Sequence, residues 1–275
     1  MTSREPVDIA AIRAAVANPN GPYARVDYTA FTGSTNADLV AAGHQNAPAW
    51  TAVVTEYQTP GRGRHGRVWT APKGSQVTLS ILIRPTAESI ERLGTMPLVS
   101  GLAIIDALTA TAARHPDATD KLTPQLKWPN DVLIDGRKLC GILAEAVSLG
   151  PEPAVVIGLG LNVSITTEEL PVPHATSLDL EAPGIEIDRA QLTADVLLAL
   201  HHRINQWVDA DPQLMADYRA VCSSIGADVK VLLPGDEELL GTVRDVADDG
   251  RLVVVDKQGA EHVLAAGDVT HLRLQ

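Results

Sequence analysis

The apolar run at residues 75–85, SQVTLSILIRP, constrains the fold more than any other stretch of the chain. Val77, Leu79, Ile81 and Ile83 recur at every second position, which is the pattern of a β-strand whose two faces differ. Further β-branched or apolar runs predict strands at residues 52–59, 125–135, 137–147 and 154–163.

Other segments carry the apolar spacing of helices. Residues 5–17 predict a short amphipathic helix, and residues 95–113 and 187–210 predict two longer ones. Asp188 is a candidate N-cap for the last of these helices. Strands and helices together predict an α/β (α+β) fold in which helices pack against a central mixed sheet.

The segment TGSTNADLVAAGH, residues 32–44, has the signals of a helix start and a helix end. Ser34 or Thr35 is the expected N-cap, the helix runs through Ala42, and Gly43 suits a left-handed C-terminal cap. The first turn of such a helix leaves backbone N–H groups available to an anion.

The pattern changes near Ser224, where only short strands separated by turn residues follow. They are expected at residues 227–234, 238–247, 250–259 and 261–274. We therefore predict two domains, one at residues 1–223 and a small all-β domain at residues 224–275.

Composition limits the partners and the compartment. The net charge of −12 argues against a surface that binds nucleic acid or anionic membrane without specificity. The first twenty residues lack the features of a secretory signal, and no stretch has the composition of a membrane span. Cys140 and Cys222 give no disulfide framework, although a single bridge stays open, and a reducing cytoplasm is the expected location.

One basic island stands out in this acidic chain. No Asp or Glu lies between Glu56 and Glu88, and the same stretch carries five Lys or Arg residues, most of them in TPGRGRHGRVW, residues 59–69. Arginine offers a rigid fork of donors and glycine admits close approach, so the segment suits phosphate or carboxylate. A solvated hairpin tip and an RNA-binding Gly-Arg segment are the alternatives, and an aromatic content of 3% disfavours the second.

A second polar group lies in LKWPNDV, where Lys127, Asn130 and Asp131 surround Pro129. Proline cannot donate to a sheet, so an edge or a break in the strand is expected there. Together with Lys138, these side chains could neutralise a reaction that joins two anions, such as attack of a carboxylate on the α-phosphate of a nucleotide. The sequence has no phosphate-binding P-loop and no dinucleotide fingerprint, so the residues alone indicate an anion-handling α/β enzyme.

The chain resembles bacterial biotin protein ligases in TGSTN, YQTPGRGRHGRVW, LKWPNDV, KLCGIL, GLGLNV and ATSL, in that order along the chain. The resemblance implies a catalytic domain like that of class II aminoacyl-tRNA synthetases and a C-terminal SH3-like β-barrel. It also implies two half-reactions, in which biotin and MgATP give biotinyl-5′-AMP, and a lysine of a biotin carboxyl carrier domain of an acyl-CoA carboxylase then takes the biotin. The arginine loop would close over the adenylate.

The resemblance assigns residues by position. It assigns biotin contacts to Ser34, Thr35, Asn36, Gln58, Gly61, Arg62, Gly63, Arg64, Lys138, Gly141 and Gly158, the last two glycines making room beside the ligand. It assigns contacts with ATP or the adenylate to Arg64, Arg67, Trp69, Lys127, Asn130, Asp131 and Asn162, with Trp69 stacked on adenine. It assigns catalysis to Lys127, Lys138, Arg62 and Arg64, and Mg²⁺ to Asp131.

Cys140 replaces a residue that is usually smaller in the family, which predicts a packing role, with a lysine-lowered thiol pKa as the alternative. About thirty residues before TGSTN leave no space for the DNA-binding domain of some members, so no transcriptional role is expected. The acidic composition adds the expectation of no partner nucleic acid and no membrane. Two functional alternatives stay open: a lipoate or octanoate protein ligase of the same fold, and a nonenzymatic module that binds biotin or RNA. The oligomeric state is open, with a weak homodimer as one alternative.

Overall fold

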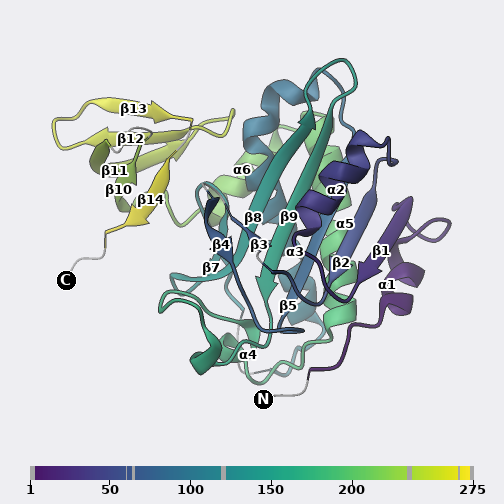
Figure 1. The fold of residues 1–275 in the computed structure, drawn as a ribbon. Coiled ribbons are helices and arrows are strands. Elements are labelled where there is room, and N and C mark those ends of the chain that lie inside the picture. Colours follow the sequence, from purple (N-terminus) through teal and green to yellow (C-terminus); the bar gives the residue numbers. More distant parts are fainter. Residues whose placement is uncertain are drawn as a thin grey trace.

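The computed structural model describes residues 4–59, 61–63, 66–118, 122–233, 237–265 and 267–272, without the side chain of Arg62. A seven-stranded sheet with helices on both faces forms the larger part, and a five-stranded sheet lies beside it (Figure 1). The first sheet holds the residues of the candidate site, and the second forms one side of it.

The seven-stranded sheet has the order β1-β2-β5-β9-β8-β7-β6. Its first pair, β1 and β2, is parallel and every other pair is antiparallel, so the predicted mixed sheet is confirmed. The strands are β1 (Arg25–Thr29), β2 (Thr51–Thr55), β5 (Gln76–Ile83), β6 (Gln125–Lys127), β7 (Asp131–Ile134), β8 (Arg137–Ser148) and β9 (Ala154–Asn162). The glycine-arginine loop joins the neighbouring strands β2 and β5 and contains a small hairpin, β3 (Gly61–Arg62) with β4 (Val68–Trp69).

The strand predicted at residues 125–135 is two strands, β6 and β7, joined by a tight turn. Lys127 pairs with Asp131, and Trp128, Pro129 and Asn130 form the turn between them. The break expected at Pro129 is therefore confirmed. Proline ends the ladder there because it has no N–H to donate.

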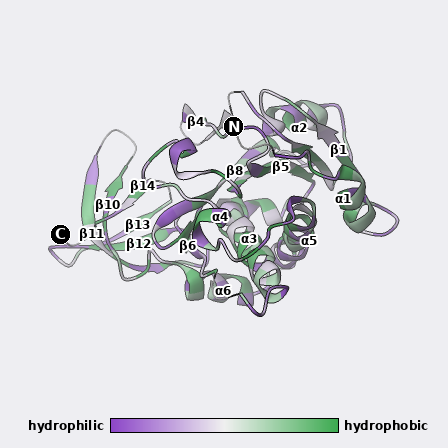
Figure 2. Cartoon of the chain, turned by 90° about the horizontal axis from the view of Figure 1, so that it is seen from below, coloured by the Kyte–Doolittle hydropathy of each residue, from purple (hydrophilic) through white to green (hydrophobic). Residues whose placement is uncertain are grey.

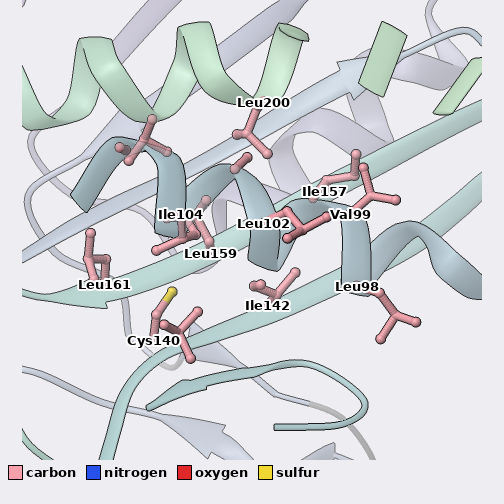
Figure 3. Packing of buried hydrophobic residues seen from close by; sticks show 14 of the residues in the cluster. Leu98, Val99, Leu102, Ile104, Cys140, Ile142, Ile157, Leu159, Leu161 and Leu200 are labelled. Carbon is pink, nitrogen blue, oxygen red and sulfur yellow. The ribbon is translucent and has the colours of Figure 1, made fainter. Parts of the chain in front are cut away.

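Two long helices, α3 (Met96–Ala113) and α5 (Arg189–Val208), pack on one face of the sheet, as predicted. Apolar side chains of α3 and α5, such as Leu102 and Leu200, meet Ile142 and Ile157 from the central strands β8 and β9 (Figure 3). This face is the main hydrophobic core. The run from Ser89 to Ala113 is long and apolar enough to cross a membrane, but most of its apolar window is buried inside the protein, as core helices are. Figure 2 shows the hydropathy of each residue along the chain, α3 included.

The opposite face of the sheet carries α2 (Thr35–His44) over part of its area. Ser34 caps α2, its Oγ accepting from the Ala37 N–H. The predicted cap at Gly43 is wrong, because the helix runs on to His44. Gly43 instead allows close packing, since a Cβ there would lie 3.2 Å from a methyl group of Val147.

The remaining helices differ from the prediction in length or were missed. The first helix, α1 (Ile9–Val16), is shorter than the predicted 5–17 because the Asp8 carboxylate caps the N–H groups of its first turn. The helix α6 (Gln213–Val221) and the single turn α4 (Leu178–Glu181) were not predicted, and short 3₁₀ segments lie at Ser89–Thr95 and Thr167–Glu169.

The C-terminal sheet is antiparallel, with the order β13-β12-β11-β10-β14. Its strands are β10 (Asp228–Leu232), β11 (Glu238–Val246), β12 (Leu252–Asp256), β13 (Glu261–Leu264) and β14 (Asp268–His271). The strand predicted at 261–274 is thus two strands, at opposite edges of the sheet. Over the described residues these edges are not paired with each other, so the sheet there is open. The domain boundary at 224 stays a prediction.

Candidate active site

A cleft of about 1010 Å³ lies over the polar face of the large sheet and reaches the C-terminal sheet. Several chain segments far apart in sequence form its wall: the start of α2, the glycine-arginine loop, the β6–β7 turn, the strands β8 and β9, and β14. The predicted site residues on the wall are Ser34, Thr35, Asn36, Gln58, Gly63, Arg67, Trp69, Lys127, Asn130, Asp131, Lys138, Gly141 and Gly158.

The floor of the cleft follows from the alternation of side chains along β5. Val77, Leu79 and Ile81 point into the hydrophobic core, so Thr78 and Ser80 take the other face. Their neighbours on β9 are glycines: Thr78 pairs with Gly160, and Ser80 pairs with Gly158. A polar strand beside a strand with glycines at alternate positions leaves the space that the cleft occupies.

One end of the cleft is neutral and rich in hydrogen-bonding groups. Gln58 Oε1 accepts from the Thr35 N–H at 2.8 Å, which joins the glycine-arginine loop to the start of α2. Asn36 is buried and its amide contacts Leu143 and Glu145 of β8. These groups present amide and hydroxyl functions without a net charge.

The other end of the cleft is cationic. Lys138 Nζ lies 2.6 Å from Asp131 Oδ1 and 5.2 Å from the centre of the Trp69 ring. Burial lowers the pKa of Lys127; the Asp131 carboxylate opposes this shift, and the Lys138 ammonium adds to it. Lysines that lose hydration in a shared pocket are suited to receiving an anion, because an anion restores the charge balance.

Trp69 lies flat on the glycines of the sheet. Its Nε1 donates to Gln76 Oε1 at 3.2 Å. A Cβ at Gly160 would lie 2.4 Å from that nitrogen, and a Cβ at Gly141 would lie 3.2 Å from the ring. Gly160 was not predicted as a site residue, although the alternate glycines of GLGLN, residues 158–162, were the available signal.

Two predicted contacts are not on the wall. Asn162 is 2% exposed, accepts from Gln76 Nε2 at 2.5 Å and donates to the Thr176 carbonyl at 2.7 Å. Neither Asn162 nor its partner Gln76 lines the cleft, and the nucleotide contact assigned to Asn162 stays a prediction. Gly61 is also absent from the wall and packs under Gln58 and Trp69.

Gly158 lies on the wall but makes room for protein atoms in this structure. A Cβ there would lie 1.9 Å from Asn36 Oδ1. Its missing side chain thus admits the Asn36 amide, and the expectation that it leaves space beside a ligand stays a prediction. Of the arginines expected at the site, Arg64 and the side chain of Arg62 lie outside the described residues.

Cys140 has no part in the cleft chemistry. Its side chain points into the hydrophobic core beside Leu161 and Ile142 (Figure 3). Burial raises the pKa of the Cys140 thiol far above its ordinary value, and the opposing effect of Lys138 is smaller. The predicted packing role is confirmed, and the alternative of a lysine-lowered pKa is wrong. Cys140 and Cys222 are both free, so the single bridge is excluded.

Residues of the C-terminal sheet complete the cleft and were missed by sequence reasoning. Asp268 accepts from Arg67 Nη2, and His271 Nε2 lies 3.0 Å from Ser224 Oγ. Burial and the nearby Lys127 lower the pKa of His271. No spacing in the sequence links these residues to Arg67, because some two hundred positions separate them along the chain.

The β6–β7 turn connects the cleft with the C-terminal sheet. The Trp128 N–H donates to Ser224 Oγ at 3.1 Å, and its Nε1 donates to the Gly250 carbonyl at 2.9 Å. The neighbouring Lys127 lies on the cleft wall. This short turn therefore touches both sheets.

Asp131 is the predicted metal ligand. Among the residues that the structure describes, no three His, Cys, Asp or Glu side chains gather into a metal site. Mg²⁺ in nucleotide sites is commonly held by one or two carboxylates together with substrate phosphates. The cationic end holds two carboxylates, Asp131 beside Lys138 and Asp268 beside Arg67, which fits a magnesium ion that arrives with ATP and does not fit a metal held by protein alone.

Comparison with known proteins agrees with this architecture. The model of the biotin/lipoate A/B protein ligase family matches residues 28–162, and that of the biotin protein ligase C terminal domain matches residues 224–272. The biotin–[acetyl-CoA-carboxylase] ligase of Mycobacterium tuberculosis is 42% identical over 271 residues, which cover 98% of this chain and 97% of the relative.

More distant relatives are also named as ligases. The bifunctional ligase/repressor BirA of Bacillus subtilis is 29% identical over 81% of this chain and 67% of its own length. A structure of the biotin protein ligase from Aquifex aeolicus in complex with biotin and ATP has the same fold, with a TM-score of 0.74 at 24% identity, covering 92% of this chain and all of that one. The chain therefore belongs to the biotin/lipoate A/B protein ligase family and, within it, to the biotin protein ligases.

Proposed function

We propose that this protein is an ATP-dependent biotin protein ligase. In the first half-reaction a carboxylate oxygen of biotin attacks the α-phosphorus of ATP, and the bond to the β-phosphate oxygen breaks to release pyrophosphate. In the second, the amine of an acceptor lysine attacks the carbonyl carbon of biotinyl-5′-AMP. The anhydride bond breaks, AMP leaves, and the amine loses a proton.

One observation carries the proposal: a single cleft joins a neutral hydrogen-bonding end to a cationic end. Biotin has the matching shape, with a cyclic urea at one end and a carboxylate at the other. Thr35, Asn36 and Gln58 would bind the urea. The carboxylate would then point toward Lys138, where ATP must meet it.

The cationic end would lower the barrier to the meeting of two anions. Lys138 would hold the biotin carboxylate and the bridging phosphate, and Lys127 would stabilise the charge that develops on the α-phosphate. Lys138 would exchange its contact with Asp131 for contacts with substrate, which frees that carboxylate for the magnesium ion of MgATP.

The nucleotide would lie beside Trp69, whose ring is held flat against the sheet. Adenine stacking on an aromatic ring is worth about 1–3 kcal/mol. Arg67 is on the cleft wall with a carboxylate partner on β14, and we assign it to the phosphates. Loop arginines Arg62 and Arg64 would close over the adenylate and exclude water, which would otherwise hydrolyse the anhydride.

The proposed acceptor is a lysine of a biotin carboxyl carrier domain, the acceptor class implied by the name of the Mycobacterium tuberculosis relative. The cytoplasm is the proposed location, because both cysteines are free thiols. The net charge of −12 argues against a nucleic acid as a partner.

Biotin-dependent exchange of labelled pyrophosphate into ATP tests the first half-reaction, with lipoate and octanoate in parallel assays. Exchange with biotin alone is expected, and exchange with lipoate or octanoate alone would reject the assignment. Transfer of labelled biotin to a carrier domain tests the second half-reaction.

A Lys127→Ala variant should lose about two to three orders of magnitude in the rate of adenylation, the range seen when one preorganised electrostatic group is removed. Lys73→Ala is the matched control, since Lys73 is an exposed lysine that does not line the cleft. Equal rates for the two variants would refute the role of Lys127.

A further inference from the structure

Two residues that do not line the cleft, Ser80 and Glu145, hydrogen-bond to Asn36 at its neutral end. Ser80 lies in the middle of β5 and is fully buried. Glu145 lies on β8, at the far side of Asn36. Neither residue has a role in the reaction proposed above.

These two residues and the cleft wall form one continuous chain of hydrogen bonds. Asn36 Nδ2 donates to Glu145 Oε2 at 2.6 Å and to the Leu143 carbonyl at 3.2 Å. Ser80 Oγ donates to Asn36 Oδ1 at 2.6 Å, and Thr35 Oγ1 lies 2.7 Å from Ser80 Oγ.

The direction of each bond follows from proton counting, starting at Glu145. A carboxylate can only accept, so the Asn36 amide must turn its NH₂ group toward Glu145 and its oxygen toward Ser80. A flipped amide would place two oxygens 2.6 Å apart without a proton between them. The single proton of Ser80 is therefore committed to Asn36.

The same count of protons determines to which atom the Thr35 hydroxyl donates. Two hydroxyl oxygens 2.7 Å apart must share a proton, and Ser80 has none left to give. Thr35 must donate to Ser80. Its contact of 3.1 Å with Gln58 Oε1 then carries no proton, and Gln58 Oε1 instead accepts the Thr35 backbone N–H.

The outcome is a fixed polarity on the cleft wall. The Thr35 hydroxyl already donates its proton to Ser80, so toward the cleft Thr35 Oγ1 can only accept a hydrogen bond. Gln58 has its oxygen engaged by Thr35, which leaves its NH₂ group as a donor. A planar ligand with an N–H donor beside a carbonyl acceptor matches this pair, and a cyclic urea is such a group.

We propose that Ser80 and Glu145 are positioning residues that set the hydrogen-bond polarity of the urea end of the cleft, and so determine selectivity for biotin. The inference rests on the proposed function, because it names the end of biotin that is recognised. Gly158 is needed for the same chain of hydrogen bonds, since a side chain at that position would collide with both Asn36 and Ser80.

The test compares Ser80→Ala with Ser100→Ala by pyrophosphate exchange. Ser100 is an equally buried serine whose hydroxyl bonds only to the Met96 carbonyl within α3, so it controls for the loss of a buried hydroxyl. Ser80→Ala should raise the KM for biotin about tenfold, the factor that one lost buried hydrogen bond causes, and should leave the KM for ATP within twofold. Ser100→Ala should change neither constant.

Glu145, which is only partly buried, provides a second variant that acts on the same chain of hydrogen bonds. Glu145→Ala should also raise the KM for biotin, and Glu145→Gln should restore much of the loss because its amide oxygen still accepts from Asn36. Glu152→Ala, an exposed glutamate outside the cleft, is the matched control.

Dethiobiotin separates the two ends of the bicyclic ring, because it keeps the urea and lacks the sulfur-containing ring. Its KM should rise by the same factor as that of biotin in Ser80→Ala and Glu145→Ala. An unchanged KM for biotin, an equal rise for ATP, or a rise for biotin without one for dethiobiotin would overturn the inference. Absence of biotin-dependent exchange in the unmodified protein would instead reject the proposed function itself.

Discussion

The alternate glycines of β9 allow the two ends of the cleft to be perturbed separately. Gly158 and Gly160 lie two residues apart on the same face of one strand. A methyl group at Gly160 would meet the Trp69 ring at 2.4 Å, and a methyl group at Gly158 would meet the Asn36 amide at 1.9 Å. Each distance is far shorter than a van der Waals contact, so the side chain above must move.

Gly160→Ala should therefore act on ATP and Gly158→Ala on biotin. Displacing Trp69 removes stacking worth about 1–3 kcal/mol, which is about a fivefold to 150-fold rise in the KM for ATP. Displacing Asn36 breaks its bond to Ser80, and a buried polar group left unpaired costs about 1–3 kcal/mol, so a similar rise is expected in the KM for biotin. Overpacking should cost each variant about 1–3 kcal/mol of unfolding free energy.

Pyrophosphate exchange, with each substrate varied at saturation of the other, measures both constants. Gly150→Ala is the control, because a Cβ at that position would meet nothing within 4 Å. Equal rises of both constants in both variants would show that β9 does not separate the substrates. An unchanged KM for ATP in Gly160→Ala would refute the stacking assigned to Trp69.

Three further predictions concern charge, thiols and ligand binding. Burial lowers the pKa of Lys127, and the role that we propose for it needs its ammonium form. Adenylation should therefore decline with rising pH well before the ordinary lysine value of 10.5, and Lys127→Arg should shift that decline to higher pH; coincident pH profiles would contradict the assignment. Iodoacetamide at neutral pH should leave the buried Cys140 and Cys222 unmodified in the native protein and modify both in denaturant, as mass spectrometry can establish; labelling of the native protein would contradict the burial. Biotin with ATP should raise the melting temperature more than biotin alone, since the adenylate binds only the folded chain, and calorimetry without an added shift would exclude loop closure on the adenylate.

Local patterns predicted the larger elements because they depend on neighbours in sequence. The alternation along β5 and the apolar spacing of α5 are properties of short windows, and both elements formed as expected. Pro129 predicted a break because a missing N–H acts within one residue of its position. The cap at Gly43 was wrong because the helix runs on to His44, and the packing of Gly43 against Val147 is a long-range contact that a local pattern cannot show.

The cleft was predictable where residue type alone carries the chemistry, as with Lys127 and Lys138. The residues behind the cleft wall were not predictable, because their role depends on their position in the sheet. Ser80, for example, resembles any polar residue of a strand in the sequence. Asp268 and His271 could not be found from sequence, because their place in the cleft depends on how the two sheets pack. The contact of Asn162 with Gln76, away from the cleft wall, could not be found from sequence for the same reason.

The turn at Trp128 joins the large sheet to the C-terminal part of the chain through two hydrogen bonds. Its indole donates to the Gly250 carbonyl in the C-terminal part of the chain, while the adjoining Lys127 lines the cleft, so we expect a displacement of the C-terminal sheet to move Lys127 as well. Exchanging the C-terminal portion between related enzymes would consequently alter the alignment of Lys127. A chimera of this kind must carry the residues around Gly250 that receive the indole, or its catalytic rate will suffer even though every reactive group is present.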